Sequence, residues 1–255
     1  MPAQKLTFLA SDNAEAIKAK NLLKEKYSDV GLECADVVVA LGGDGFMLQT
    51  LHLVCNKSGV PVYGMNKGTV GFLMNKFSEV DLINRIYSAK EEVVYPLKMT
   101  ATKSDESKEE GLAINEISLL RSGPQAANLK ISVDGSLRLK ELVCDGALVC
   151  TPAGSTAYNY SAHGPILPIG ANILALTAMS AYRPRRWRGA LLPMDARIDI
   201  EIVDFAKRPV SAVADGVEVK NVKKVSISIE QKIEHRLLFD PGHGLEERLL
   251  KEQFE

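Results

Sequence analysis

The chain has 255 residues, of which 46% are hydrophobic and 25% are charged, and its formal net charge is -1. These values are typical of a folded globular protein with one large domain or two small ones, and they exclude a disordered or low-complexity chain. A net charge so close to zero provides no overall field that would attract a polyanion, so no nucleic-acid partner is expected.

The N-terminus leads into a short apolar run that polar residues interrupt, and this run is too short for a signal peptide or a membrane span. We therefore expect a cytoplasmic protein with no membrane partner. The cysteines form no CxxC pair and have no histidine at a zinc-finger offset, so we expect reduced, buried thiols and not a zinc site. They are Cys34, Cys55, Cys144 and Cys150.

The first part of the chain alternates short β-rich runs with segments of helical periodicity, which is the pattern of a parallel sheet built from βαβ units. The first strand is predicted at 5–9. Asp12 would cap the helix that follows, and the apolar face of that helix would be formed by Ile17, Leu22 and Leu23.

A second strand is predicted at 37–41, where a continuous apolar run indicates burial on both faces of a sheet. A helix follows at once, with apolar positions at Phe46, Leu48, Leu51 and Val54.

A third strand is predicted at 60–65. Ser78 would then cap another helix, and Leu82, Ile83 and Ile86 would form its buried face.

The second part of the chain changes to alternating strands with turn signals such as Asp134-Gly135 and Asp215-Gly216, the pattern of an antiparallel β-rich domain. The last stretch, 244–255, carries leucines at helical spacing among charged residues, and we expect a short amphipathic helix that packs on the first domain. The predicted domains are 1–95 together with the tail 236–255, and 96–235.

A glycine-rich loop follows the second predicted strand, and it reads Gly42-Gly43-Asp44-Gly45. Glycines at a strand-to-helix turn allow positive φ and a close approach of the backbone, while the helix N-terminus attracts phosphate. Ligands of open α/β sheets bind at the carboxyl ends of strands, which is where this loop lies. A plain turn with an aspartate cap remains the alternative, because Asp and Gly are common in turns.

The loop lacks the Lys-Ser/Thr ending of a Walker motif and is not a GxGxxG fingerprint. Phosphate would repel the carboxylate of Asp44, so this side chain needs a task at a phosphate site. It can accept a proton from an attacking hydroxyl, or it can help to hold a divalent cation.

Two further segments carry polar groups next to apolar strands. Asp145 precedes the strand predicted at 147–150, and the Gly/Ser/Thr-rich loop 151–161 follows it, with hydroxyls, amides and Tyr158 suited to a ribose and a base. Asn115 and Glu116 are embedded in a strand predicted at 112–120, so at least one of them faces inward or lines a cavity. An ordinary loop and a half-exposed strand edge are the alternatives.

Together, the Gly-Gly-Asp-Gly loop, the Asn115-Glu116 pair and the Thr-Pro-x-Gly-Ser-Thr-Ala-Tyr loop that begins at Thr151 resemble the NAD kinase family in order and spacing. The segment Gly-Met-Asn-Lys-Gly-Thr-Val-Gly-Phe-Leu at 64–73 is also similar to a loop of that family. The resemblance implies an N-terminal Rossmann-like α/β domain and a C-terminal β-sandwich-like domain. It also implies transfer of a phosphoryl group to the 2′-hydroxyl of the adenosine ribose of NAD.

The resemblance implies roles at the matching positions. Asp44 would be the catalytic proton acceptor, and Gly42, Gly43 and Gly45 would let phosphates approach the backbone. The residues expected to contact NAD are Asp44, Gly45, Asn115, Glu116, Asp145, Ala153, Thr156, Ala157, Tyr158, Asn159 and Ser161.

The implied substrates are NAD and ATP, with polyphosphate as an alternative donor, and the implied cofactor is Mg²⁺ or another divalent cation whose ligands stay unassigned. A homodimer or homotetramer is expected. A lipid kinase of the diacylglycerol or sphingosine type, which shares the glycine motif, and a non-catalytic NAD-sensing module are the alternatives.

The sequence departs from the family pattern at Phe46, where many members have Thr, and at Ala153, where Thr is commoner. It also departs at Val143, where some members carry Arg. These departures affect the contacts expected for the donor and the pyrophosphate. The basic segment 183–188 would either supply the missing cation or form a solvated loop. Its arginines are Arg183, Arg185, Arg186 and Arg188.

Overall fold

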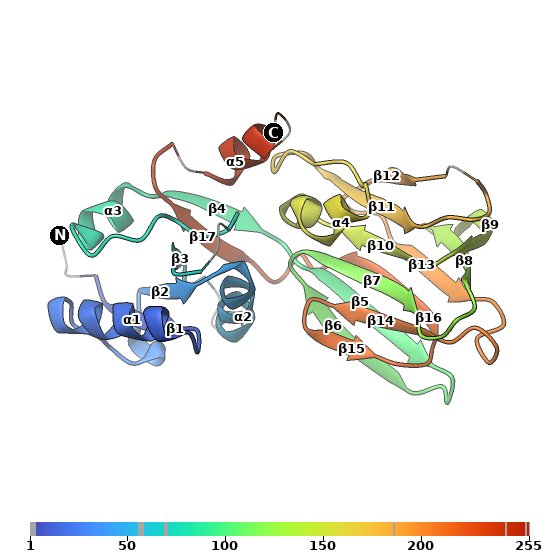
Figure 1. The fold of residues 1–255 in the computed structure, drawn as a ribbon, viewed down its shortest axis with the longest axis horizontal. Helices are drawn as coiled ribbons and strands as arrows, with labels where there is room; N and C mark the ends of the chain where they lie inside the picture. The colour runs from blue at the N-terminus through green and yellow to red at the C-terminus, as the bar shows by residue number, and fades with distance from the viewer. Residues whose placement is uncertain are drawn as a thin grey trace. The chain divides into compact units, whose positions relative to one another are not determined.

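In the computed structural model the chain forms two units, an α/β unit of residues 1–94 with 232–255 and a β-rich unit of residues 95–231 (Figure 1). The structure describes residues 4–55, 59–68, 71–185, 187–242, 244–252 and 254. Arg186 and positions 69 and 70 of the predicted loop lie outside the described residues.

The first unit is built on a sheet with the strand order β1-β2-β3-β17-β4. The strands are β1 (Leu6–Ala10), β2 (Val37–Gly42), β3 (Val62–Asn66), β17 (His235–Phe239) and β4 (Lys90–Val94). The first four are parallel, and β4 pairs with β17 in the antiparallel direction. Every residue of β2 is buried, as its apolar run predicts.

The helices of this unit are α1 (Ala14–Lys26), α2 (Asp44–Val54), α3 (Leu82–Ser88) and α5 (Leu245–Glu252), with a 3-10 turn at Leu32–Cys34. Figure 1 shows α1 alongside β1 and β2. Both α1 and α3 share a hydrophobic core with side chains of β1, β2 and β3.

The predicted details of α1 are wrong in two respects. Asn13, and not Asp12, caps α1, because its side-chain oxygen accepts the amide of Glu15 at 2.8 Å. Ile17 is 41% exposed, and the buried face of α1 consists of Ala16, Ala19 and Leu23.

Ser78 does not cap α3. The N-cap is Asp81, which has a φ of 60° and makes no side-chain capping bond, while the Ser78 hydroxyl accepts the amide of Val80. Helix α2 forms as expected, but its fully buried residues are Met47, Thr50, Leu51 and Val54, so the buried stripe is rotated relative to the predicted one.

Among the described residues, the second unit forms two six-stranded sheets with the orders β12-β11-β10-β7-β14-β15 and β6-β5-β16-β13-β8-β9. Side chains from both sheets form one hydrophobic core. This antiparallel β-rich architecture is the predicted one. The strands are β5 (Leu97–Lys103), β6 (Lys108–Ala113), β7 (Glu116–Arg121), β8 (Ala127–Val133), β9 (Ser136–Cys144), β10 (Gly146–Cys150), β11 (Ile173–Met179), β12 (Gly189–Pro193), β13 (Ile198–Ile202), β14 (Val210–Ala214), β15 (Val217–Val219) and β16 (Val222–Ile229).

The single strand predicted at 112–120 is two strands in different sheets. Strand β6 ends at Ala113, and β7 begins at Glu116, so Ile114 and Asn115 form the crossing between the sheets. A continuous apolar pattern cannot reveal this break, because both strands bury side chains in the same core.

The expectation of buried thiols holds for Cys144 and Cys150, where burial raises the pKa to about 12, but Cys34 is exposed and Cys55 is partly so. All four are free. Of the helices that the structure describes, none has the length and apolar character needed to cross a membrane.

Candidate functional site

The glycine loop joins the carboxyl end of β2 to the N-terminus of α2, with Gly43 as the N-cap and Asp44 as the first helical residue. The expected positive φ is wrong here, because the positive-φ glycines of the described residues lie elsewhere and Gly43 is extended, with a φ of -111°. A side chain at Gly42 would come within 2.8 Å of Cβ of Phe46. By contrast, a Cβ at Gly43 or Gly45 would meet no atom of the described residues within 4 Å. Close packing therefore requires glycine at 42, and open space adjoins 43 and 45.

Both carboxylate oxygens of Asp44 accept backbone hydrogen bonds from one short segment. The amide of Phe72 donates to Oδ2 at 2.7 Å, and the amide of Leu73 donates to Oδ1 at 2.9 Å. A Cβ on Gly71 would lie 2.4 Å from Oδ1, so this segment approaches the carboxylate as closely as it does because residue 71 is glycine. The carboxylate is thus held in one orientation at the helix N-terminus.

The segment after β3 packs against the glycine loop. The Lys67 amide donates to the carbonyl of Gly42 at 2.8 Å, and a Cβ on Gly68 would lie 3.7 Å from Cα of Gly43. The Lys67 ammonium lies 3.4 Å from the centroid of the Phe77 ring. The segment after β3, which resembles a loop of the NAD kinase family, therefore contacts the glycine motif directly.

In the second unit, the crossing at Ile114 and Asn115 is held from two sides. The Asp215 carboxylate accepts the amides of Ile114 at 2.7 Å and Asn115 at 3.2 Å. On the other side, the Thr151 hydroxyl donates to the carbonyl of Ile114 at 2.7 Å. A Cβ on Gly154 would lie 2.2 Å from the carbonyl oxygen of Asn115. The Asn115-Glu116 pair and the loop 151–161 therefore meet in the structure.

Glu116 has an unusual carboxyl group. Burial, followed by the negative charge of Asp215, raises its pKa from 4.5 to about 7, while the backbone amide of Tyr158 opposes that rise. Its Oε2 atom is buried and makes no hydrogen bond within the part of the chain that is described. Such a group beside a polar loop is typical of a functional position.

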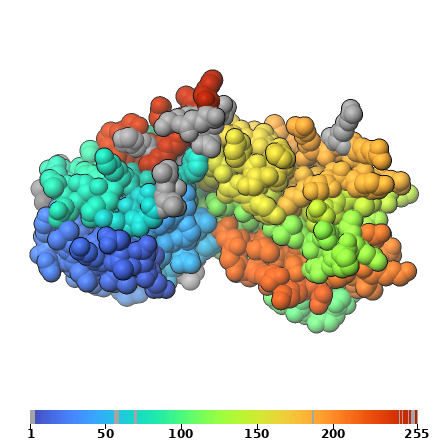
Figure 2. All heavy atoms as spheres, in the orientation of Figure 1, coloured from blue at the N-terminus to red at the C-terminus, as the bar shows by residue number. Residues whose placement is uncertain are grey.

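The loop after β10 forms a 3-10 turn (Ala153–Thr156) and then the short helix α4 (Tyr158–Ser161). Tyr158 is 38% exposed, and Figure 2 shows the segment around α4, in yellow, on the visible surface of the second unit. Asn159 differs from its neighbours because its side chain is fully buried. Its Nδ2 donates to the carbonyls of Ser155 and Pro165, and its Oδ1 accepts the Thr177 hydroxyl at 2.6 Å, so this amide fastens the loop internally.

Asp145 lies between β9 and β10, and its carboxylate accepts from Nε of Arg121 at 2.5 Å. The backbone of Arg183 pairs with that of Val143. The guanidinium of Arg185 lies 5.8 Å from the centroid of the Tyr182 ring. The start of the basic segment therefore lies beside Val143.

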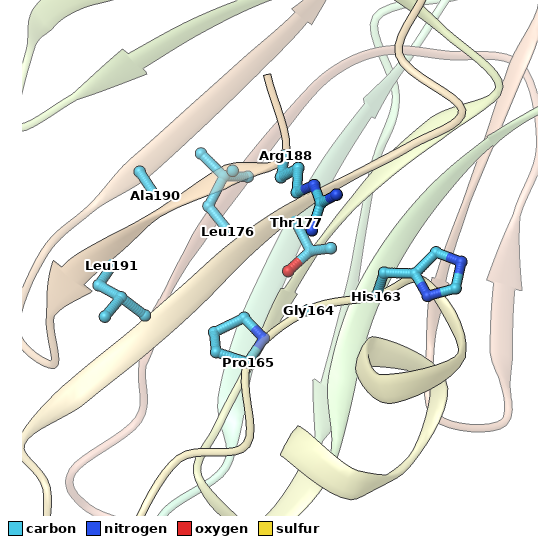
Figure 3. A pocket seen from close by; sticks show the side chains of 9 residues that line it. His163, Gly164, Pro165, Leu176, Thr177, Arg188, Ala190 and Leu191 are labelled. Carbon is cyan, nitrogen blue, oxygen red and sulfur yellow. The ribbon is translucent and has the colours of Figure 1, made fainter. Parts of the chain in front are cut away.

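A cavity of about 290 Å³ lies in the second unit, between β11 and the start of β12 on one side and the loop after α4 on the other (Figure 3). Its walls include Thr177, Arg188 and Pro165, and none of the predicted NAD-contacting residues lines it. In the described ranges, no group of three or more His, Cys, Asp or Glu side chains is arranged to hold a metal ion.

The predicted site residues thus fall into two sets. Gly42, Gly43, Asp44 and Gly45 belong to the first unit, and the remainder, from Asn115 to Ser161, belong to the second. Their joint arrangement around a dinucleotide stays a prediction. Sequence reasoning missed Asp215 as the partner of the Ile114 and Asn115 amides. The signal for it was the Asp215-Gly216 pair, which was interpreted only as a turn.

Both halves of the chain match one family. The ATP-NAD kinase N-terminal domain matches residues 3–94, and the ATP-NAD kinase C-terminal domain matches residues 114–235. An NAD kinase of Cereibacter sphaeroides is 60% identical over 254 residues, covering 100% of both chains. An NAD kinase of Caulobacter vibrioides is 56% identical over 250 residues, covering 98% of this chain and 96% of the relative.

Two solved structures share the fold. The yeast NADH kinase complexed with NADH has a TM-score of 0.83 and 22% identity, covering 100% of this chain and 88% of the other. An NAD kinase from Archaeoglobus fulgidus in complex with ATP has a TM-score of 0.75 and 23% identity, covering 94% of this chain and 95% of the other. The predicted fold class is confirmed.

Proposed function

The chain belongs to the NAD kinase family of phosphotransferases, and from that premise we propose that it transfers the γ-phosphoryl group of ATP to the 2′-hydroxyl of the adenosine ribose of NAD. The observation that carries the proposal is a carboxylate, Asp44, held by two backbone amides where β2 ends and α2 begins.

Asp44 accepts the proton of the ribose hydroxyl as that oxygen attacks phosphorus. A carboxylate oxygen has two lone pairs, so each oxygen that accepts one amide retains acceptor capacity for a substrate hydroxyl. Phosphoryl transfer requires alignment, charge neutralisation and a proton acceptor more than it requires covalent chemistry from the protein. A fixed carboxylate supplies the proton acceptor and contributes to the alignment of the attacking hydroxyl.

Gly42, Gly43 and Gly45 border the phosphates. Among the described residues, a Cβ on Gly43 or Gly45 at the start of α2 would meet no atom within 4 Å. This space supports the role, since helix N-termini bind anions through N–H groups and the helix dipole.

The groups that contact NAD in the second unit lie in three places: at the crossing and the start of β7, on the turn before β10, and on the loop after β10. Asn115 and Glu116 bind the adenosine part, and Tyr158 supplies an aromatic face. The full proposed set is Asn115, Glu116, Asp145, Ala153, Thr156, Ala157, Tyr158, Asn159 and Ser161. Asn159 serves indirectly, because its amide holds the loop.

A divalent cation, Mg²⁺ by preference, accompanies ATP. Mg²⁺ is commonly bound through substrate phosphates with one or two carboxylates and retains several waters, so it needs no cage of protein ligands. Asp44 is the one carboxylate of the glycine loop, and it fits this sparse donor set. When bound, the ion neutralises phosphate charge.

We also propose that the enzyme is cytoplasmic and assembles as a homodimer or homotetramer. Cell fractionation and light scattering test these two properties.

The test of the function is incubation of the purified protein with NAD, ATP and Mg²⁺, followed by assay for NADP. We expect NADP to form with ATP, and parallel reactions with NADH and with polyphosphate identify the accepted substrates. Formation of no NADP with any donor would contradict the proposal and favour a non-catalytic NAD-binding protein.

Asp44→Asn keeps the shape of the side chain but removes its basicity. Because general-base assistance is typically worth about 10² to 10⁴-fold, we expect kcat to fall by at least about 10² in a variant with an unchanged melting temperature. A folded Asp44→Asn protein with undiminished kcat would rule out Asp44 as the base.

A further inference from the structure

Two consecutive peptide groups lie between Asp44 and an arginine of the C-terminal helix. Nη1 of Arg248 donates to the carbonyl oxygens of Gly71 at 3.0 Å and Phe72 at 2.9 Å. The N–H groups of those same peptide bonds belong to Phe72 and Leu73, and they donate to Oδ2 and Oδ1 of Asp44. Each peptide group thus has an anion at its N–H and a cation at its C=O.

This arrangement strengthens the hydrogen bonds on both sides. A hydrogen bond to an ionised group is roughly twice as strong as a neutral one. A peptide group that is polarised at its carbonyl also becomes a better donor at its amide, and such chains reinforce each bond by about 10 to 30%. The guanidinium therefore acts on the carboxylate without touching it.

The guanidinium of Arg248 keeps its positive charge although it is partly buried. Its guanidinium lies 5.6 Å from the centroid of the Phe239 ring, which belongs to β17 of the central sheet. Burial lowers the pKa of Arg248, and the carboxylates of Asp44, Asp240 and Glu92 oppose that effect, with Asp44 contributing the most among them. Arginine stays protonated in proteins, so the charge is retained.

We propose that Arg248 is a positioning residue for Asp44, and that it holds the carboxylate in its catalytic orientation through the peptide groups 71–72 and 72–73. The inference rests on the proposed role of Asp44 as the proton acceptor. Through Arg248, the C-terminal helix α5 helps to orient the proton acceptor, although α5 lies about 200 residues after the glycine loop along the chain.

The test is Arg248→Ala, with kcat and both KM values measured separately. Small misplacement of a catalytic group costs up to about 10²-fold in rate, so we expect kcat to fall at least about tenfold while KM for NAD and ATP changes less than about twofold. Guanidinium chloride at a low, non-denaturing concentration should restore part of the lost kcat by occupying the vacated site. An unchanged kcat, or a loss confined to KM, would overturn the proposal.

A double-mutant cycle isolates the route through Asp44. In an Asp44→Asn background, Arg248→Ala should lower kcat less than about twofold further, because coupled residues are not additive. Fully additive losses would show that Arg248 acts by another route.

Arg236→Ala is the matched control. That arginine belongs to the same unit and donates to Glu91 and to the carbonyl of Gly59, away from the 71–73 segment. It should leave kcat unchanged and show no response to guanidinium.

Should Arg248→Ala fail to fold, Arg248→Lys replaces it, since a single ammonium keeps the charge but lacks the planar fork of the guanidinium. We expect an intermediate kcat for a folded Arg248→Lys, and wild-type kcat would overturn the proposal.

A native enzyme that makes no NADP would refute the proposed function. An active enzyme whose kcat does not respond to substitution of Arg248 would refute this inference alone.

Discussion

At the scale of single residues, Glu116 is the group whose protonation should be visible in stability. Its pKa is raised from 4.5 to about 7, chiefly by burial, so between these pH values the folded state holds a proton that the unfolded state releases. The stabilisation from the neutral carboxyl is complete below pH 4.5 and is lost as the pH rises through 7, where the folded protein must bury a charge.

Glu116→Gln should remove this dependence. We expect the variant to be more stable than the native protein at pH 8 by on the order of 1 to 3 kcal/mol, and to differ little at pH 5. Urea unfolding at a series of pH values measures the difference. Glu110→Gln, a change at an exposed position of β6, is the control. Parallel stability curves for all three proteins would contradict the assignment.

At the scale of elements, the contact between the loop after β10 and the crossing at 114–115 depends on the absence of a side chain at Gly154. A Cβ there would lie 2.2 Å from the carbonyl oxygen of Asn115, and backbone atoms cannot move aside as a flexible side chain can. The hydrogen bonds from the Ile114 and Asn115 amides to Asp215 keep the crossing from yielding on the far side.

Gly154→Ala should therefore destabilise the fold by about 1 to 3 kcal/mol and raise KM for NAD, because it displaces Asn115. Gly170→Ala is the matched control, since a Cβ at Gly170 would meet no described atom within 4 Å. Thermal unfolding and steady-state kinetics measure the two effects. Equal behaviour of the two variants would show that the loop relaxes without moving Asn115.

At the scale of the whole molecule, the chain returns to its first unit after completing the second. Strand β17 is inserted between β3 and β4, and Leu237, Leu238 and Phe239 are buried. An internal strand supplies hydrogen bonds to two neighbours and apolar contacts on both faces, so the first unit cannot form its sheet without it.

A chain that ends at residue 231 should consequently lose the first unit and retain the β-rich second unit. Hydrogen exchange should show protection confined to 95–231, and phosphoryl transfer should be absent. A control chain that ends at residue 253 lacks the exposed side chain of Phe254 and should behave as the native chain. Protection of β1, β2 and β3 in the truncated protein would show that β17 is dispensable.

Local chemistry determined much of this molecule from its sequence alone. The buried β2, the helix directly after the glycine loop and the antiparallel character of the second unit follow from periodicity and turn residues. The NAD kinase family is indicated by motifs that resemble those of its members. Such signals extend over a few residues, which is why they can be recognised without a fold.

Only the tertiary structure decided how those residues are supported. The hydrogen bonds of Asp215 to the crossing and the link from Arg248 to Asp44 join positions 100 or more residues apart. The break at 114–115 and the insertion of β17 depend on which sheet a strand enters. In each case a side chain or strand satisfies distant backbone groups, and backbone groups are the same at every position. No residue pattern therefore marks the partner, and packing alone selects it.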